Sequence, residues 1–277
     1  AGNDVMIVDA SDGRLLGTVD YGRAGSQVHP GAVYLHQGES FVIDHLDLDS
    51  GVALATPDEP AYTTQPKSTT DIAIMSAAED EHLIDLGGGV WLAYVDVEVT
   101  DHVVGFHQRF PDGTQSELFP LDLPQQRLRT RAVAYTIDPL ALTAMGLSAA
   151  DIPGALHAAE HAAIGLLPLI ATCDRWDIGG VSTALHQDTN LPTVFVYDGH
   201  PGGAGFAEEG FRRFAEWITA TFDAVRSCEC SDGCPSCVQS PKCGNGNQPL
   251  SKAGALKLLG GLVTLCQSHP HFTMNVD

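Results

Sequence analysis

The chain has 277 residues, 44% of them hydrophobic, so it can bury one large core or two of ordinary size. Lysine and arginine total 14 against 35 acidic residues, which gives a formal net charge of −21. A free-standing nucleic-acid-binding protein usually presents a basic surface, because counterion release from phosphates supplies most non-specific affinity. The composition argues against that class. Without a signal peptide or a long apolar stretch, the chain is expected to be cytoplasmic and to have no membrane partner.

The N-terminal half alternates short apolar runs with turns rich in glycine and aspartate. Hairpin signals occur at Asp12-Gly13, at residues 37–40 and at Asp49-Ser50-Gly51. Their close spacing predicts a small β-barrel-like module over residues 1–66. Further strand signals cover residues 71–75, 89–99, 103–109 and 128–135. We expect this β-rich segment, residues 67–139, to continue into the C-terminal domain.

After Pro139 the apolar residues recur with a helical period. Helices are expected over residues 154–170, 206–225 and 252–267, with a strand over 193–198. The pattern predicts an α/β domain over residues 140–277 and an α+β fold class for the whole chain. The loop at residues 199–205 is rich in glycine and joins a strand to a helix, so it could cradle an anion. A tight turn explains its glycines equally well.

Five cysteines lie within sixteen residues near the C-terminus. They are Cys228, Cys230, Cys234, Cys237 and Cys243. A C-x-C pair followed by a C-x-x-C pair offers thiolates for tetrahedral zinc, and a closed four-cysteine set indicates a structural ion. The odd total of seven cysteines and the poor disulfide geometry of C-x-C neighbours argue against disulfides. We predict one structural Zn²⁺, and the spacing leaves open whether Cys243 replaces Cys228 as a ligand.

A second pattern, H-x-x-E-H, is formed by His157, Glu160 and His161. In inverted zinc proteases the two histidines hold zinc on one helical face and the glutamate acts as base. Such a site needs a third ligand from elsewhere, and a five-residue match arises easily by chance in an alanine-rich helix. A zinc hydrolase is therefore an alternative function, and a purely structural role for these side chains is the simpler interpretation.

Arginines in two places are candidates for contact with nucleic acid. Arg127, Arg129 and Arg131 alternate, so in a strand they project from one face, while Arg212 and Arg213 are neighbours on an expected helix. With so many carboxylates in the chain, ion pairing on the surface explains any one of these arginines as well.

Four stretches carry a resemblance to a known family: HPGAVYLHQGESFVIDHLDLDSGVALA, LHAAEHAAIGLLPLIATCDRWDIGG, TVFVYDGHPGGAGFAEEGF and CECSDGCPSCVQSPKCGNGNQPLSKAGALKLL. The last three resemble the C-terminal zinc-binding domain of MrfA-like superfamily 2 DNA helicases. The first resembles the β-rich module that precedes it. The resemblance covers nearly the whole chain and implies that the zinc ligands are Cys228, Cys230, Cys234 and Cys237.

The same resemblance implies a parent protein that moves 3′ to 5′ on single-stranded DNA and unwinds duplexes in DNA repair. This sequence has no Walker A motif, so ATP and Mg²⁺ are expected only in motor domains of the parent. The chain itself is expected to be a non-catalytic module whose partners are single-stranded DNA and those motor domains, at the nucleoid. An acidic protein-interaction module that never touches DNA is the remaining alternative.

Overall fold

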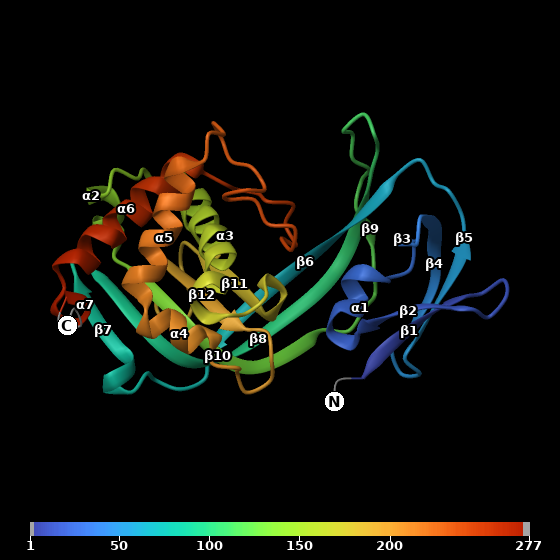
Figure 1. Cartoon of the computed structure of the whole chain (residues 1–277), viewed down its shortest axis with the longest axis horizontal. Helices are drawn as coiled ribbons and strands as arrows, with labels where there is room; N and C mark the ends of the chain where they lie inside the picture. Colours follow the sequence, from blue (N-terminus) through green and yellow to red (C-terminus); the bar gives the residue numbers. More distant parts are fainter. Residues whose placement is uncertain (1–2, 274–277) are drawn as a thin grey trace. The chain divides into compact units, whose positions relative to one another are not determined.

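The computed structural model describes residues 3–273, which form two compact units. The first unit comprises the chain up to Thr69 together with Asp101–Gln126, and the second comprises Thr70–Thr100 and the chain from Arg127 onward. Three strands run from one unit into the other: β6 (Thr63–Ile74), β8 (Val90–Arg109) and β10 (Gln126–Ile137) (Figure 1). Residues 67–139, expected to continue into the C-terminal domain, are divided between the two units, with residues 101–126 in the first.

The first unit is built on a five-stranded, nearly closed, barrel-like sheet. Its strand order is β2-β1-β5-β4-β3, and the strands are β1 (Asp4–Asp9), β2 (Leu15–Asp20), β3 (Val33–His36), β4 (Glu39–Asp47) and β5 (Val52–Pro57). Alternate residues point inward, as the period of a strand requires: Val5 and Ile7 of β1 are buried, as are Phe41 and Ile43 of β4. The barrel-like module predicted from the turn spacing is confirmed.

Sequence periodicity does not predict the helix α1 (Tyr21–Gln27) of the first unit. Its seven residues include two glycines, which weaken helical propensity. The helix starts because the carboxylate of Asp20 caps the amide of Gly22 at 2.8 Å, and it is held to the sheet through the buried Ala24. Tertiary contact thus overrides weak local preference.

The second unit contains the larger sheet, with the strand order β11-β12-β10-β8-β6. Its further strands are β7 (Leu83–Gly87), β11 (Ile178–Thr183) and β12 (Thr193–Asp198), and the two-residue β9 (Phe119–Pro120) pairs with β8 in the first unit. The two strand signals expected at 89–99 and 103–109 belong to the single continuous strand β8, which is 20 residues long. Strand β12 is confirmed at its predicted bounds, and all six of its residues are buried.

Helices cover one face of the larger sheet (Figure 1). They are α2 (Pro139–Ala144), α3 (Ile152–Ala171), α4 (Phe206–Arg212), α5 (Phe214–Ser227), α6 (Lys252–Ser268) and α7 (Pro270–Thr273), with short 3₁₀ turns at Asp80–His82, Ala149–Asp151 and Arg175–Asp177. The single helix expected over 206–225 is interrupted at Arg213, where ψ is 33°. The mixed sheet and helices agree with the predicted α/β C-terminal domain.

Helix α3 is the centre of the second unit and contacts α5, α6, β11 and β12. The indole nitrogen of Trp217 on α5 donates to the carbonyl of Ala163 on α3 at 2.8 Å. Residues 149–171 are apolar and long enough to cross a membrane, but 67% of the most apolar window is buried inside the structure. Such burial is typical of a core helix, and α3 provides a fixed surface on which the following loops are held.

Candidate metal centre

The segment between α5 and α6 contains the cysteine cluster and no helix or strand in the part of the chain that the structure describes. It turns sharply after Cys234, whose carbonyl accepts the amides of Cys237 at 3.0 Å and Gln239 at 3.2 Å. Gly233 adopts φ of 114°, and a side chain there would place its Cβ 2.6 Å from Val238. Cys237 and Val238 are the buried hydrophobic residues of this segment, so apolar packing contributes little to its order.

Four sulfur atoms converge in this segment, which we call the four-cysteine knuckle. Its members are Cys228, Cys230, Cys234 and Cys237. Contacts between their Sγ atoms measure 3.4, 3.5, 3.5 and 3.8 Å. A tetrahedral zinc with Zn–S bonds of about 2.3 Å places its sulfur ligands about 3.8 Å apart. The geometry therefore fits one Zn²⁺, and a closed set of four thiolates holds it for structure.

A buried lysine supports the negative charge of the knuckle. Lys252, at the start of α6, is 7% exposed and donates to the carbonyls of Cys228 at 2.8 Å and Cys230 at 2.5 Å. Its Nζ also lies 3.3 Å from the Sγ of Cys230. Burial opposes ionisation of Cys230, but hydrogen bonds from the neighbouring thiols and from Lys252 outweigh it and lower the pKa of that thiol to about 6. The sequence gives no signal for this role of Lys252.

Cys243 lies outside the knuckle and beside the histidines of α3 instead. Its Sγ is 3.6 Å from the Nε2 atom of His157 and accepts the amide of Asn247 at 3.3 Å. Burial opposes ionisation of Cys243, but a hydrogen bond from His161 and nearby backbone amides lower its pKa overall. The fold thus assigns Cys228 to the knuckle, and it supplies the H-x-x-E-H pattern with the third potential ligand that the sequence could not locate.

Both histidines are fixed by backbone carbonyls. The Nδ1 atom of His157 lies 2.7 Å from the carbonyl of Pro249, and Nδ1 of His161 lies 2.9 Å from that of Val238. A carbonyl can only accept, so each Nδ1 carries a proton, and in the neutral imidazole Nε2 is the nitrogen available to a metal. The Nε2 atoms of His157 and His161 and the Sγ atom of Cys243 lie within 4.8 Å of one another. We call this set the His-His-Cys cluster.

Glu160 is buried beside this cluster, with 5% of its surface exposed. Its Oε2 lies 3.6 Å from the Nε2 of His161. Burial raises the pKa of Glu160 to about 7, against the opposing effect of His157. A residue with a Cβ at position 180 would place that atom 2.8 Å from the Cγ of Glu160, so the backbone of β11 closes the site on that side. A catalytic base needs access to substrate, and this enclosure favours a structural role.

The backbone amides of the glycine-rich loop after β12 bind a side chain of the protein itself, that of Asp198. The carboxylate of Asp198 is fully buried and accepts the amides of Ala204 at 2.7 Å, Gly205 at 3.0 Å and Ala207 at 2.8 Å. These are the amides that a bound phosphate would require. The turn is therefore completed by Asp198, in agreement with the simpler of the two interpretations.

The three alternating arginines of β10 all pair with acidic side chains of β8. Glu98 lies 4.0 Å from Arg127 and 3.2 Å from Arg129, while Asp96 lies 3.1 Å from Arg131. The guanidinium of Arg131 also lies over the ring of Tyr94, 4.3 Å from its centroid. Phosphates would have to displace these carboxylates to reach the arginines.

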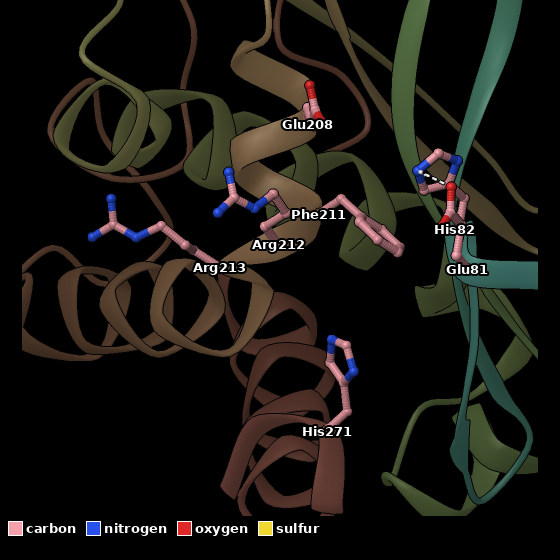
Figure 2. Close-up of a pocket in the computed structure, with 7 residues that line it drawn as sticks. All are labelled: Glu81, His82, Glu208, Phe211, Arg212, Arg213 and His271. Carbon is pink, nitrogen blue, oxygen red and sulfur yellow. Dashed lines mark ion pairs between the residues drawn. The ribbon is translucent and has the colours of Figure 1, made fainter. Parts of the chain in front are cut away.

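Arg212 and Arg213 line a pocket of about 490 Å³ in the second unit (Figure 2). The figure shows Phe211 directed toward His82, while the two guanidinium groups lead away from it. Arg212 pairs with Glu209 at 2.8 Å, and Arg213 pairs with Glu216 at 2.7 Å. The five candidate arginines thus share one feature: an intramolecular carboxylate already faces each of them.

Comparison with known proteins supports the assignment of zinc to the knuckle and shows that the chain is similar to part of several helicases. Residues 159–238 match the family model described as the MrfA Zn-binding domain. The chain is 30% identical over 241 residues to the uncharacterized ATP-dependent helicase YprA of Bacillus subtilis, covering 85% of this chain and 31% of YprA. It is 27% identical over 263 residues to the ATP-dependent helicase hrq1 of Schizosaccharomyces pombe, covering 88% of this chain and 24% of hrq1.

A crystal structure of the DUF1998 helicase MrfA bound to DNA has the same fold over 94% of this chain, with a TM-score of 0.63 and 28% sequence identity. The shared region is 34% of that helicase chain. The present chain therefore spans about a quarter to a third of the length of the helicases it matches.

Proposed function

This chain belongs to the MrfA zinc-binding domain family, and on that premise we propose that it serves as the non-catalytic C-terminal module of an ATP-dependent superfamily 2 DNA helicase. The observation that carries the proposal is the four-cysteine knuckle, built inside a fold shared with MrfA over 94% of the chain. Its zinc would be structural, and ATP with Mg²⁺ would be bound by the motor domains of the parent.

The second part of the proposal concerns the action of the parent protein on DNA. We infer that the parent translocates 3′ to 5′ on single-stranded DNA and unwinds duplexes in repair, acting at the nucleoid in the cytoplasm. A relative solved with DNA bound supports a DNA partner. The module would support strand engagement next to the motor domains, and its arginines would exchange Glu98 and Asp96 for phosphates when the strand is present.

The acidity of the chain limits how strongly it can bind DNA alone. A net charge of −21 repels phosphates, so affinity must come from a local patch. Stacking of bases on aromatic side chains adds about 1–3 kcal/mol per base. We therefore expect weak, salt-sensitive binding by the isolated chain.

The test is fluorescence anisotropy with a labelled single-stranded oligonucleotide at several salt concentrations. Replacing Arg127, Arg129 and Arg131 together by glutamine should weaken binding and make the dependence on salt shallower, by about 0.7 in logarithmic slope per lost phosphate contact. Arg226→Gln is the matched control, since Arg226 also pairs with a surface carboxylate, Asp223 at 2.9 Å. An absence of binding at low salt would contradict the DNA role and favour the protein-interaction module.

The zinc hydrolase built on His157, Glu160 and His161 is a separate alternative. Its general base would be Glu160, which is 5% exposed and enclosed by β11. Hydrolysis of a model peptide or ester that disappears in Glu160→Gln would favour the hydrolase over the helicase module.

A further inference from the structure

We propose that His157, His161 and Cys243 bind a second Zn²⁺ ion, separate from the knuckle, and that this ion fastens the loop at residues 239–249 to helix α3. The proposal concerns residues of this chain alone and does not depend on the helicase function. It raises the predicted metal content from one ion to two per chain.

The distances suit a metal. The Sγ of Cys243 lies 3.6 Å from the Nε2 of His157. A tetrahedral zinc with bonds of about 2.3 Å to sulfur and about 2.0–2.1 Å to nitrogen places these two atoms about 3.6 Å apart. The rings of His157 and His161 lie edge to face, with centroids 4.1 Å apart and an interplanar angle of 62°, so both side chains reach the same point beside α3. All three donor atoms lie within 4.8 Å of one another.

The surroundings fix the donors in the state that a metal requires. Each Nδ1 atom is engaged by a backbone carbonyl, at 2.7 Å for His157 and 2.9 Å for His161, which leaves Nε2 as the ring nitrogen available to a metal. Metal-binding histidines almost always carry such an outer hydrogen bond. The amide of Asn247 donates to the sulfur of Cys243 at 3.3 Å, which stabilises a thiolate.

The sulfur of Cys243 contacts both histidine rings. The three side chains therefore converge on one point, although they come from helix α3 and from a loop. One cation at that point would bind the two Nε2 atoms and the thiolate together.

The loop that the ion would fasten has little else to hold it. Residues 239–249 contain no helix or strand and no buried hydrophobic residue among those the structure describes. Its contacts with the rest of the unit are polar: the carbonyl of Pro249 lies 2.7 Å from Nδ1 of His157, and Lys242 donates to the carbonyls of Arg175, at 2.9 Å, and of Ile178. Within the loop, Ser240 and Asn247 bond each other at 2.6 and 3.0 Å. A metal that joins Cys243 to α3 supplies the missing constraint on the chain.

The donor set indicates the class of metal. Two imidazoles and one thiolate suit Zn²⁺, whereas carboxylate-rich sites suit Mg²⁺ or Ca²⁺. Glu160 is buried beside this donor set, with its Oε2 3.6 Å from the Nε2 of His161. We assign Glu160 a positioning role, in which its carboxylate balances the charge of the ion directly or through a water.

The first test is the zinc content of the purified full chain by mass spectrometry. The wild-type chain should contain two equivalents, and Cys243→Ala and His157→Ala should each contain one. Cys173→Ala is the matched control, because Cys173 is a half-buried cysteine outside both clusters, and it should retain two. Circular dichroism confirms that each variant is folded. One equivalent in the wild type that is unchanged in Cys243→Ala would overturn the proposal.

A titration of the metal-free wild-type chain with Co²⁺ gives an answer that does not depend on any variant. Two equivalents should bind, and both should contribute thiolate-to-cobalt absorption, since each cluster contains cysteine. Saturation at a single equivalent would overturn the second site while leaving the knuckle intact.

Discussion

The knuckle and the His-His-Cys cluster are two candidate metal sites of the same unit, and they differ in how the chain brings their ligands together. The knuckle draws four sulfurs from residues 228–237, so a pair of tight turns is enough to assemble it. The second cluster joins α3 to a loop, and two of its donors, His157 and Cys243, lie 86 positions apart in the chain. The knuckle can therefore be predicted from the spacing of its cysteines, whereas the ligands of the His-His-Cys cluster meet only when the core around α3 has formed.

The largest expected effect comes from breaking the local site. Cys234→Ser should lose the knuckle zinc and lower the thermal stability of the second unit sharply, because structural zinc contributes an apparent binding free energy of about 10–16 kcal/mol in small zinc domains. Thermal unfolding followed by circular dichroism measures this loss. Cys173→Ser should unfold near the wild-type temperature, and equal melting of the two variants would show that the knuckle holds no essential metal.

A smaller effect is expected from the lysine that supports the knuckle. Lys252→Met keeps an unbranched apolar side chain, one atom shorter than lysine, but removes its hydrogen bonds to Cys228 and Cys230. Loss of an outer-sphere partner of this kind weakens metal affinity about 10–100-fold. Competition with a zinc chelator measures the change. Lys257→Met on the same helix serves as control, since Lys257 donates to Gly146 at 3.1 Å, away from the cysteines.

The second cluster can be examined through pH. Glu160 has a folded-state pKa of about 7 against an ordinary value of 4.5, so between these values the folded chain holds a proton that the unfolded chain has lost. Stability from this group is therefore present below about pH 4.5 and is lost as the pH rises to about 7, by at most about 3 kcal/mol.

The variant Cys243→Ala, which should lack the second ion, is expected to show this loss between pH 5 and 7, and Cys243→Ala/Glu160→Gln should not. Melting temperatures across that range measure the difference between the two variants. In the wild type a cation beside Glu160 opposes protonation of its carboxylate, so the melting temperature should depend less on pH than in Cys243→Ala. Identical pH profiles for the two variants would contradict the raised pKa of the Glu160 carboxyl.

The smallest effect is local. Cys243→Ala should raise amide hydrogen exchange within residues 239–249 while residues 228–237 remain as protected as in the wild type. Hydrogen exchange followed by mass spectrometry resolves the two segments. Equal exchange of the loop in Cys243→Ala and in the control Cys173→Ala would show that Cys243 does not anchor it.

Much of the fold was readable from the sequence because its signals are local. The apolar run at 193–198 and the periodic segment from Lys252 match β12 and α6 within one residue. Strand β11 was missed, because Gly179 and Gly180 suggest a loop. The structure shows why glycine stands there: a Cβ would lie 2.5 Å from Tyr197 at the first position and 2.8 Å from Glu160 at the second.

The candidate sites also differ in how far their contacts can be predicted from local sequence. The cysteine spacing predicted a four-sulfur site, but only the fold separates Cys228 from Cys243 as its member. The partners of the arginines were equally hidden, because Glu98 is supplied by β8 and the arginines by β10. Residues far apart in sequence become neighbours through sheet pairing, which composition and periodicity do not encode.

The most direct measurement is anomalous diffraction at the zinc edge from crystals of this chain. We predict one peak at the centre of the knuckle, about 2.3 Å from each of its four sulfurs, and a second between Nε2 of His157, Nε2 of His161 and Sγ of Cys243. A zinc ligated by Cys243 in place of Cys228, or no zinc at the four sulfurs, would contradict the account of two separate sites.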